Sequence, residues 1–357
     1  MVHETPSAGT LDHRYECVEY CKNDVLVLAL GMRAYRNIAL EASGCDPLLK
    51  STAAGSAMQE FLERDYGPRQ LAVLKPHEIS LTRKAFYGGR TEIFTPLYEL
   101  SRKQISDGWV GRYDDLISLY PSVQIMMPTP YGPPKMHGPV ADRLHDWIMH
   151  AGTGFVQVDV TPPDNLLHPI LPTRVNDHVL FGLEEIKDHV YTLIEMRCAI
   201  SHGYEVARIY EGMTFACCTD MFTSYMTRNL RNKILCSSVP ADALTYCKEL
   251  KERIGIIIEP SEFKKNPGLK TVSKLKCNSL WGKLAERTHP KRMVVTRPQY
   301  MRKLEMHRAG RISIEEEEAI SANEIALLVK DFEDTSSSYR TNISLAAHVT
   351  ANGRMRL

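Results

Sequence analysis

The sequence is poor in the features that mark secreted and membrane proteins. Its longest apolar run, Val25–Met32, has eight residues and includes a glycine, whereas a helix needs ~20 apolar residues to cross a bilayer. The nine cysteines are an odd number and contain no Cys-x-x-Cys pair, so neither a disulfide framework nor a zinc knuckle is indicated. The N-terminus shows no signal or transit pattern. We therefore expect an intracellular, soluble protein with reduced cysteines and no membrane contact.

A strong net charge is also missing, because 44 Lys and Arg residues stand against 43 Asp and Glu. This balance argues against a uniformly basic nucleic-acid binder. The charges are unevenly distributed, however: residues 263–308 contain 13 basic and two acidic residues, and residues 309–334 contain eight acidic and two basic ones. A basic cluster of this size is typical of proteins that hold phosphates, although a solvated helix face would give the same pattern. Charge alone leaves the two interpretations open.

Periodicity and turn residues predict a mixed α+β fold, and 357 residues are enough for two or three domains. Helices are expected over residues 15–40 and 52–61, from Ser118 onward, and over 220–235, 241–254, 269–285 and 342–357. Strands are expected over 109–115, 155–160, 179–183 and 205–215. Residues 128–139 contain five prolines and two glycines, which predicts an irregular loop. Residues 314–330 are expected to be helical or mixed.

The first informative string is Asp115-Leu-Ile-Ser-Leu-Tyr-Pro-Ser122, at a predicted junction of strand and helix. A carboxylate at the end of a strand, followed by a helix N-terminus, offers a hard-cation ligand beside backbone N–H groups aimed at an anion. A Mg²⁺-bound triphosphate requires these two features together. A strand that merely ends in Asp is the commoner case, so this string alone does not decide the function.

A second string, Lys274-Leu-Lys-Cys-Asn-Ser-Leu-Trp-Gly-Lys283, is predicted to be helical. On a helix Lys274, Asn278 and Trp281 share one face at positions i, i+4 and i+7. A cation, an amide and a flat aromatic ring in line could meet a phosphate, a base edge and a base face. An amphipathic surface helix would show the same spacing.

Together the two strings resemble motifs A and B of the family B DNA polymerases, in the same order, with Lys274 lying 159 residues after Asp115. Further segments are similar to the protein-primed organellar and viral branch, which has a Tyr-x-Gly-Gly element. These segments are Phe86-Tyr87-Gly88-Gly89-Arg90, Glu195-x-x-x-Ala-Ile-x-x-Gly-Tyr204, Asn266-Pro-Gly-Leu269 and Asn342-x-x-x-x-Ala-x-x-Thr-Ala-x-x-Arg-x-x-Leu357. Tyr20-Cys-Lys-Asn-Asp24 resembles the third exonuclease motif, Tyr-x-x-x-Asp.

The sequence departs from the family pattern at several points. Phe86 and Trp281 stand where the family commonly has tyrosine. Residues 1–19 contain no Asp-x-Glu exonuclease motif, and no Asp-Thr-Asp follows the predicted helix at 342–357. Two similar strings, Asp331-Phe-Glu333 and Asp334-Thr-Ser336, precede that helix, so we interpret them as solvated loop residues. The resemblance thus implies a fragment.

The resemblance implies an α+β family B polymerase core without the thumb. Residues 1–80 would be the C-terminal remnant of a ribonuclease-H-like 3′–5′ exonuclease domain, and 81–130 the linker element and palm motif A. Residues 131–218 would form a palm insertion associated with the priming protein. Residues 219–290 would form the fingers with motif B, and 291–357 a second insertion and the palm helix that leads to the missing motif C.

The implied reaction is template-directed addition of deoxynucleotides in DNA replication, by phosphoryl transfer at two Mg²⁺ ions. Asp115 would be the catalytic metal ligand, and Tyr20 and Asp24 would be the exonuclease remnant, with Asp24 as a metal ligand. The implied nucleotide-binding residues are Leu116, Ser118, Leu119, Tyr120, Lys274, Asn278, Trp281 and Gly282. The implied DNA-binding residues are Phe86, Tyr87, Gly88, Gly89, Arg90 and Lys283, with Lys264 and Lys270 as further phosphate contacts.

The implied partners are primer–template DNA, dNTP, a terminal priming protein and a second polypeptide that supplies motif C and the thumb. Because both reactions need carboxylates from at least two elements, we expect the 357-residue chain alone to show neither polymerase nor exonuclease activity. Two alternatives stay open. The chain could be a catalytically inactive fragment or one half of a split polymerase, and either form would bind DNA and nucleotide only.

Overall fold

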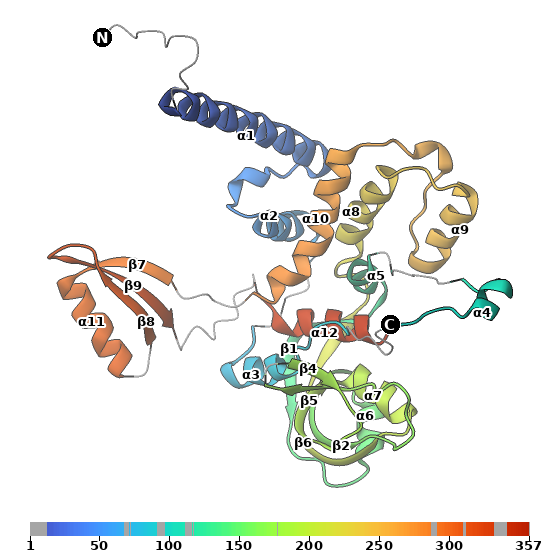
Figure 1. Ribbon diagram of the computed structural model, residues 1–357. Helices are drawn as coiled ribbons and strands as arrows, with labels where there is room; N and C mark the ends of the chain where they lie inside the picture. The colour runs from blue at the N-terminus through green and yellow to red at the C-terminus, as the bar shows by residue number, and fades with distance from the viewer. Residues whose placement is uncertain are drawn as a thin grey trace, which may run out of the picture. The chain divides into compact units, whose positions relative to one another are not determined.

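The structure is a computed structural model that describes residues 13–67, 71, 73–90, 97–110, 116, 118–176, 178–286, 291–309, 312–331 and 341–356. It has the expected mixture of helices and antiparallel sheets (Figure 1). The chain divides into two compact units. The first comprises the described part of Met1–Arg64 with Arg228–Cys277, and the second comprises the described parts of Asp65–Thr227 and Asn278–Leu357.

The first unit is helical throughout its described residues. Its elements are α1 (His13–Ser43), a 3₁₀ turn (Pro47–Leu49), α2 (Ala53–Glu60), most of α8 (Thr223–Leu235), α9 (Ala243–Ile254), a second 3₁₀ turn (Pro260–Glu262) and the first part of α10 (Pro267–Leu284). The sequence predicted these helices within a few residues of their ends. Thr52 caps α2 as expected, because its side chain accepts a hydrogen bond from the Gly55 N–H.

A buried acidic residue holds several of these helices together. The Glu60 carboxylate on α2 accepts a hydrogen bond from Arg228 Nη2 on α8 at 2.8 Å, and the Lys276 Nζ on α10 lies 2.6 Å from it. Lys276 Nζ also donates to Ser43 Oγ, at the end of α1. Two opposite charges taken out of water in this way are tolerated only when both are paired. Lys276 therefore lies on the buried face of α10 and is not available to a DNA phosphate.

The second unit contains a four-stranded antiparallel sheet in the order β1-β6-β2-β5. Its strands are β1 (Thr129–His137), β2 (Thr153–Thr161), β5 (Ile186–Thr192) and β6 (Glu205–Cys218). The side chains of Val156, Val158 and Val160 share one core cluster with residues of α6 (Leu144–His150) and α7 (Leu193–Ser201). The Phe155 side chain lies on the opposite face, where its ring packs against that of His348 of α12 (Ile343–Arg354). The two ring centroids are 4.7 Å apart. The sheet is thus covered by helices on both faces.

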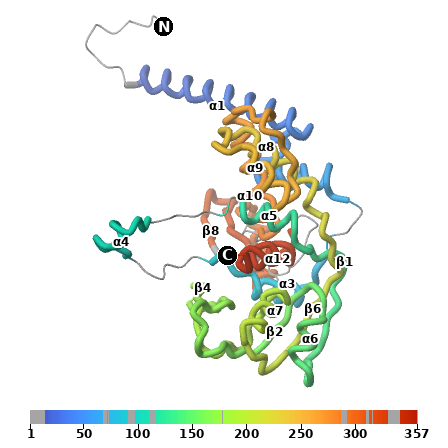
Figure 2. Tube along the Cα trace, turned by 90° about the vertical axis from the view of Figure 1, so that its right-hand side faces the viewer, coloured from blue at the N-terminus to red at the C-terminus, as the bar shows by residue number. Residues whose placement is uncertain are grey.

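The remaining elements of the second unit are shorter. They are α3 (Pro76–Lys84), α4 (Arg102–Ser106), α5 (Leu119–Met126), the hairpin β3 (Pro172–Val175) and β4 (His178–Phe181), and a small module of β7 (Lys291–Thr296), α11 (Arg297–Arg308), β8 (Ile312–Ala319) and β9 (Glu324–Asp331). In both views α12 lies beside α3 (Figures 1 and 2), and the two helices are in contact. Among the described residues, no helix combines the length and apolar character needed to cross a membrane.

Two predictions of secondary structure were wrong. Residues 128–139 are largely a strand, β1, which lies at the edge of the sheet and shifts register between Tyr131 and Lys135. Edge strands and bulges tolerate prolines, which cannot donate to a neighbouring strand. Residues 314–330 lie in the antiparallel hairpin of β8 and β9, in a sheet of order β7-β9-β8. The strand β8 contains an acidic run, and glutamate is depleted in strands, so the local pattern did not favour a strand there. Asp331 ends β9 and so is not a loop residue, whereas 332–340 and the predicted strand residues 111–115 lie outside the described residues.

The buried imidazole of His348 gives the second unit a defined response to pH. Burial lowers the pKa of His348 to about 4, and its Nδ1–H donates to the Ser344 carbonyl at 2.8 Å. Between pH 6.5 and 4 the unfolded chain binds this proton and the folded chain does not. The free energy of unfolding should therefore fall as the pH falls through this window, by up to ~1.4 kcal/mol per pH unit.

Urea unfolding between pH 4 and 7 measures this effect. His348→Gln should have a flatter pH dependence than the wild type, whereas His150→Gln, at an exposed position on α6, should follow the wild type. Parallel curves for the wild type and His348→Gln would contradict the assignment.

Candidate functional site

The strand-to-helix junction predicted around residue 115 places a backbone turn in front of α5. Asp115 and Ile117 lie outside the described residues, and Leu116 is about half exposed. Ser118 precedes α5 with φ 58°, a left-handed conformation that is uncommon for residues other than glycine. Its carbonyl accepts from the Ser122 N–H. The N–H groups of Leu119 and Tyr120 begin the helix, where backbone donors have no partner within the helix, so they are placed to meet an anion.

Tyr120 is the point at which the separate motifs meet. Its ring lies 4.7 Å, centroid to centroid, from that of Trp281, which comes from α10. A Cβ on Gly89 would lie 3.0 Å from the Tyr120 hydroxyl, and a Cβ on Gly353 would lie 2.9 Å from ring atom Cε1. Three segments that lie far from Tyr120 in the sequence therefore surround its ring.

The helix α10 has an exposed face and a buried face, as the spacing predicted. Lys270, Lys274 and Asn278 are exposed and Trp281 is partly so, at intervals of three or four residues. Gly282 is exposed beside them, and Lys283, partly buried, lies 2.5 Å from Glu286. The opposite face is buried and consists of Val272, Ser273, Lys276, Cys277, Leu280 and Leu284. The predicted nucleotide-binding residues of this helix thus share its exposed face.

A second buried ion pair fixes the loop that contains Gly88 and Gly89. Arg354 Nη1 donates to the carbonyls of Tyr87 and Gly88, at 2.7 Å each, and Arg354 Nε and Nη2 donate to Glu195 Oε1 at 3.0 and 2.5 Å. The other oxygen of Glu195 accepts from the Thr192 N–H and hydroxyl at the start of α7. One buried carboxylate therefore joins α7, α12 and the glycine loop.

The aromatic residues before these glycines are not equivalent. Tyr87 is only 2% exposed and its ring stacks on that of Tyr191 at 5.8 Å. Burial raises the pKa of Tyr87. We therefore assign the Tyr87 side chain to the core and no longer propose it as a DNA contact. Phe86 is partly exposed, and Gly88 and Gly89 are exposed.

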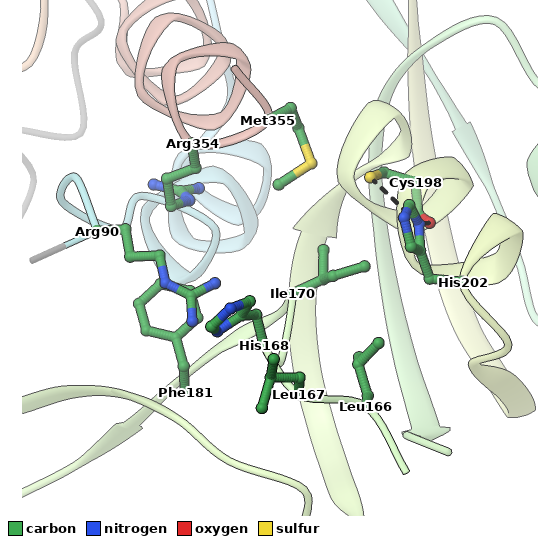
Figure 3. A pocket seen from close by; sticks show the side chains of 10 residues that line it. All are labelled: Arg90, Leu166, Leu167, His168, Ile170, Phe181, Cys198, His202, Arg354 and Met355. Atoms are coloured by element: carbon green, nitrogen blue, oxygen red, sulfur yellow. Dashed lines mark hydrogen bonds between the residues drawn. The ribbon is translucent and has the colours of Figure 1, made fainter. Parts of the chain in front are cut away.

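Arg90 lines a cavity of about 690 Å³ beside this loop (Figure 3). Its guanidinium lies 4.4 Å from the centre of the Phe181 ring, and Nη1 donates to the Pro169 carbonyl at 2.7 Å. Arg354, His168 and His202 also line the cavity, together with apolar side chains that include Leu167, and none of its lining residues is acidic. A ligand that fits this lining would have an anionic group for the arginines and a flat apolar group for the apolar side chains.

The predicted exonuclease residues lie on α1. Tyr20 and Asp24 are four residues apart on this 31-residue helix, and both are exposed. Among the described residues, no group of three or more His, Cys, Asp and Glu side chains could hold a metal ion. The carboxylate predicted to do so, Asp115, is not among them.

Comparison with known proteins identifies the family. The sequence profile of "DNA polymerase type B, organellar and viral" matches residues 3–239, more than half of the chain. The chain belongs to this family.

Two DNA polymerases are similar in sequence to this type B polymerase chain. It is 27% identical over 226 residues to a "probable DNA polymerase" of Neurospora intermedia, covering 60% of this chain and 22% of the relative. It is 25% identical over 277 residues to a "DNA polymerase" of Kluyveromyces lactis, covering 75% of this chain and 24% of the relative. The chain thus spans about a quarter of the length of these curated relatives.

The fold is that of Phi29 DNA polymerase. The complex of that enzyme with primer-template DNA and incoming nucleotide substrates matches with a TM-score of 0.57 and 15% identity, over 99% of this chain and 53% of that chain. Its complex with single-stranded DNA matches with a TM-score of 0.54 and 15% identity, over 98% of this chain and 49% of that chain. The expected α+β polymerase core is confirmed.

The roles of Glu195 and Arg354 in this type B polymerase chain were not predicted from the sequence. Both stand in segments that resemble the family, but an isolated Glu or Arg in a sequence is usually a surface residue. The available signal was Thr192, three residues before Glu195, because Thr-x-x-Glu is a capping box that marks the start of a helix. Nothing local pointed to the distant partner, Arg354.

The buried pair of Arg354 and Glu195 should contribute strongly to stability. Arg354→Met leaves the Glu195 carboxylate uncompensated and should cost about 3–5 kcal/mol. Arg292→Met is the matched control, because Arg292 pairs with Glu318 at 2.9 Å on the surface, where a pair contributes less than about 1 kcal/mol. Urea unfolding of both variants measures the difference. Equal losses would show that burial of the first pair has no energetic consequence.

Proposed function

We propose that this chain forms part of a template-directed DNA polymerase site. The observation that carries the proposal is the convergence of motif A, motif B and the glycine element on the Tyr120 ring. In the proposed reaction, a 3′-hydroxyl, or a protein hydroxyl at initiation, is extended by a dNTP. The family supports this chemistry, and the solved Phi29 polymerase complexes contain primer-template DNA with nucleotides and single-stranded DNA.

In this proposal the incoming nucleotide lies beside the start of α5 and the Trp281 end of α10, which both belong to the second unit. The triphosphate meets the N–H groups of Ser118, Leu119 and Tyr120, and the motif assigns the Lys274 ammonium to the triphosphate as well. Asn278, Trp281 and Gly282 line the nascent base pair, with Trp281 as a stacking surface. The exposure of these α10 residues supports the assignment.

We assign the template strand to the glycine element and the adjoining cavity. Gly88 and Gly89 allow a close approach of the backbone, and the guanidinium of Arg90 gives the cavity the positive charge that a phosphate requires. Within this scheme the proposed domain boundaries are those given from the sequence: 1–80, 81–130, 131–218, 219–290 and 291–357. A priming protein and a second polypeptide with the remaining palm strands belong to the same scheme.

Asp115 is the proposed Mg²⁺ ligand for polymerisation, and Asp24 for the exonuclease remnant. The described residues do not bring together the several oxygen donors that Mg²⁺ requires. When bound, the ion would neutralise phosphate charge.

Calorimetric titration of the chain with dATP tests the proposal. With Mg²⁺ present, Asp115→Asn should weaken binding at least about tenfold, because the ion loses a ligand, whereas Asp107→Asn, at an exposed position in the same segment, should not. Without Mg²⁺ the Asp115→Asn effect should vanish. No nucleotide binding by the wild type would refute the proposal. Primer extension with the same proteins then separates the alternatives, since binding without Asp115-dependent extension indicates an inactive or split form.

Tyr120 is proposed to act as the sugar gate. Its ring, at the start of α5, would lie under the ribose and clash with a 2′-hydroxyl. Tyr120→Ala should therefore reduce the preference for dATP over ATP by at least about tenfold, whether in binding or in extension by the completed enzyme. An unchanged preference would remove Tyr120 from this role.

DNA binding should depend steeply on salt through the basic stretch Phe263–Arg308. The logarithm of the binding constant should fall by roughly 0.7–0.9 per phosphate contacted, for each unit of log salt concentration. The double variant Lys270→Glu/Lys274→Glu should flatten this slope, because both side chains are exposed on α10. Lys50→Glu, exposed but outside the stretch, should leave it unchanged. A salt-independent wild type would mean that the basic stretch does not hold DNA.

A further inference from the structure

We propose that Gly353, together with Gly89, is a specificity-determining residue, because the two glycines fix the position of the Tyr120 ring. This inference rests on the proposed role of Tyr120 against the nucleotide sugar. It gives Gly353 a role and adds a second role for Gly89, which the proposed function places beside the template strand.

Neither glycine leaves ordinary room for a Cβ beside the Tyr120 ring. A Cβ on Gly353 would lie 2.9 Å from Tyr120 Cε1 and 3.3 Å from Cδ1, and a Cβ on Gly89 would lie 3.0 Å from the hydroxyl oxygen. Ordinary contacts of this kind begin at 3.4 Å. Trp281 bounds the ring as well, with its ring centroid 4.7 Å away. An alanine at either glycine must displace the tyrosine or the backbone.

The backbone of both glycines is held, so the displacement falls on the ring. Arg354, which follows Gly353, is anchored to Glu195 and donates to the Gly88 carbonyl, next to Gly89. The Arg354 guanidinium therefore holds the backbone beside both Gly353 and Gly89.

Backbone conformation does not explain Gly353. It is not among the residues with positive φ, and the cap of α12 is Met355 in a right-handed conformation. Glycine is unfavourable inside a helix, so its presence next to the last residue of α12 calls for another reason. The close approach of the Tyr120 ring supplies one.

A spectroscopic measurement tests the geometry without any ligand. In the full chain labelled with 5-fluorotryptophan, the Trp281 resonance is assigned by its loss in Trp281→Phe. Gly353→Ala and Gly89→Ala should each shift this ¹⁹F resonance, because the neighbouring Tyr120 ring moves. Gly31→Ala is the matched control, since Gly31 lies in helix α1 and a Cβ there meets no heavy atom within 4 Å. Unshifted resonances in both glycine variants would overturn the proposal.

A conservative change at Tyr120 separates the two contacts. Tyr120→Phe removes the hydroxyl that faces Gly89, so it should abolish the effect of Gly89→Ala. It should leave the effect of Gly353→Ala, which acts on ring carbons. If Gly353→Ala fails to fold, Gly89→Ala with and without Tyr120→Phe decides the question alone.

Nucleotide selectivity tests the consequence. The ratio of the dissociation constants for dATP and ATP, measured with Mg²⁺, should change at least about threefold in Gly353→Ala. In a Tyr120→Ala background, Gly353→Ala should have no further effect, because the coupling runs through the ring. A ratio that responds to Tyr120→Ala and not to either glycine variant would overturn the inference while the proposed function stands. A ratio that ignores Tyr120→Ala would refute the sugar gate itself.

Discussion

The buried contact between Arg354 and Glu195 is the interaction on which the arrangement of the second unit depends. A carboxylate and a guanidinium removed from water are costly unless their donors and acceptors are satisfied. Here Glu195 accepts from Arg354 through one oxygen and from Thr192 through the other, while the rest of the guanidinium donates to the Tyr87 and Gly88 carbonyls. Moving α7, α12 or the glycine loop would leave a buried charge without its partner. The pair therefore enforces one relative position of the three.

The resemblance to the family gains a physical explanation from this contact. The segments around residues 86–90, 195–204 and 342–357 are far apart in the sequence, yet each contributes an atom to the same network. Tyr120 then packs against the residues next to that network, Gly89 and Gly353. The position of the Tyr120 ring depends on the backbone at Gly89 and Gly353, and the Arg354 network holds that backbone in place. The motifs therefore depend on one another.

The sequence predicted those features that depend on residues close together in the chain. The helices and the two faces of α10 follow from periodicity, and Lys274, Asn278 and Trp281 were correctly placed on the outer face. The edge strand β1 could not be predicted, because it pairs with the distant strand β6 and its edge position tolerates its prolines. The hairpin of β8 and β9 was missed because glutamate, which fills much of β8, is depleted in strands. The burial of Lys276 could not be predicted from the sequence, because its partner Glu60 lies on a helix far earlier in the chain. The junction at Asp115 stays a prediction.

The basic stretch 263–308 is, in consequence, not one uniform surface. Lys276 is neutralised in the core by Glu60, Lys283 lies against Glu286, and Arg292 pairs with Glu318 of the acidic strand β8. Each of these charges is compensated by a neighbouring carboxylate, so it contributes little field at a distance. Lys270 and Lys274, by contrast, are exposed on the face of α10 that also presents Asn278. The positive charge that α10 offers to an anion therefore comes from its exposed lysines, and not from all 13 basic residues of the stretch.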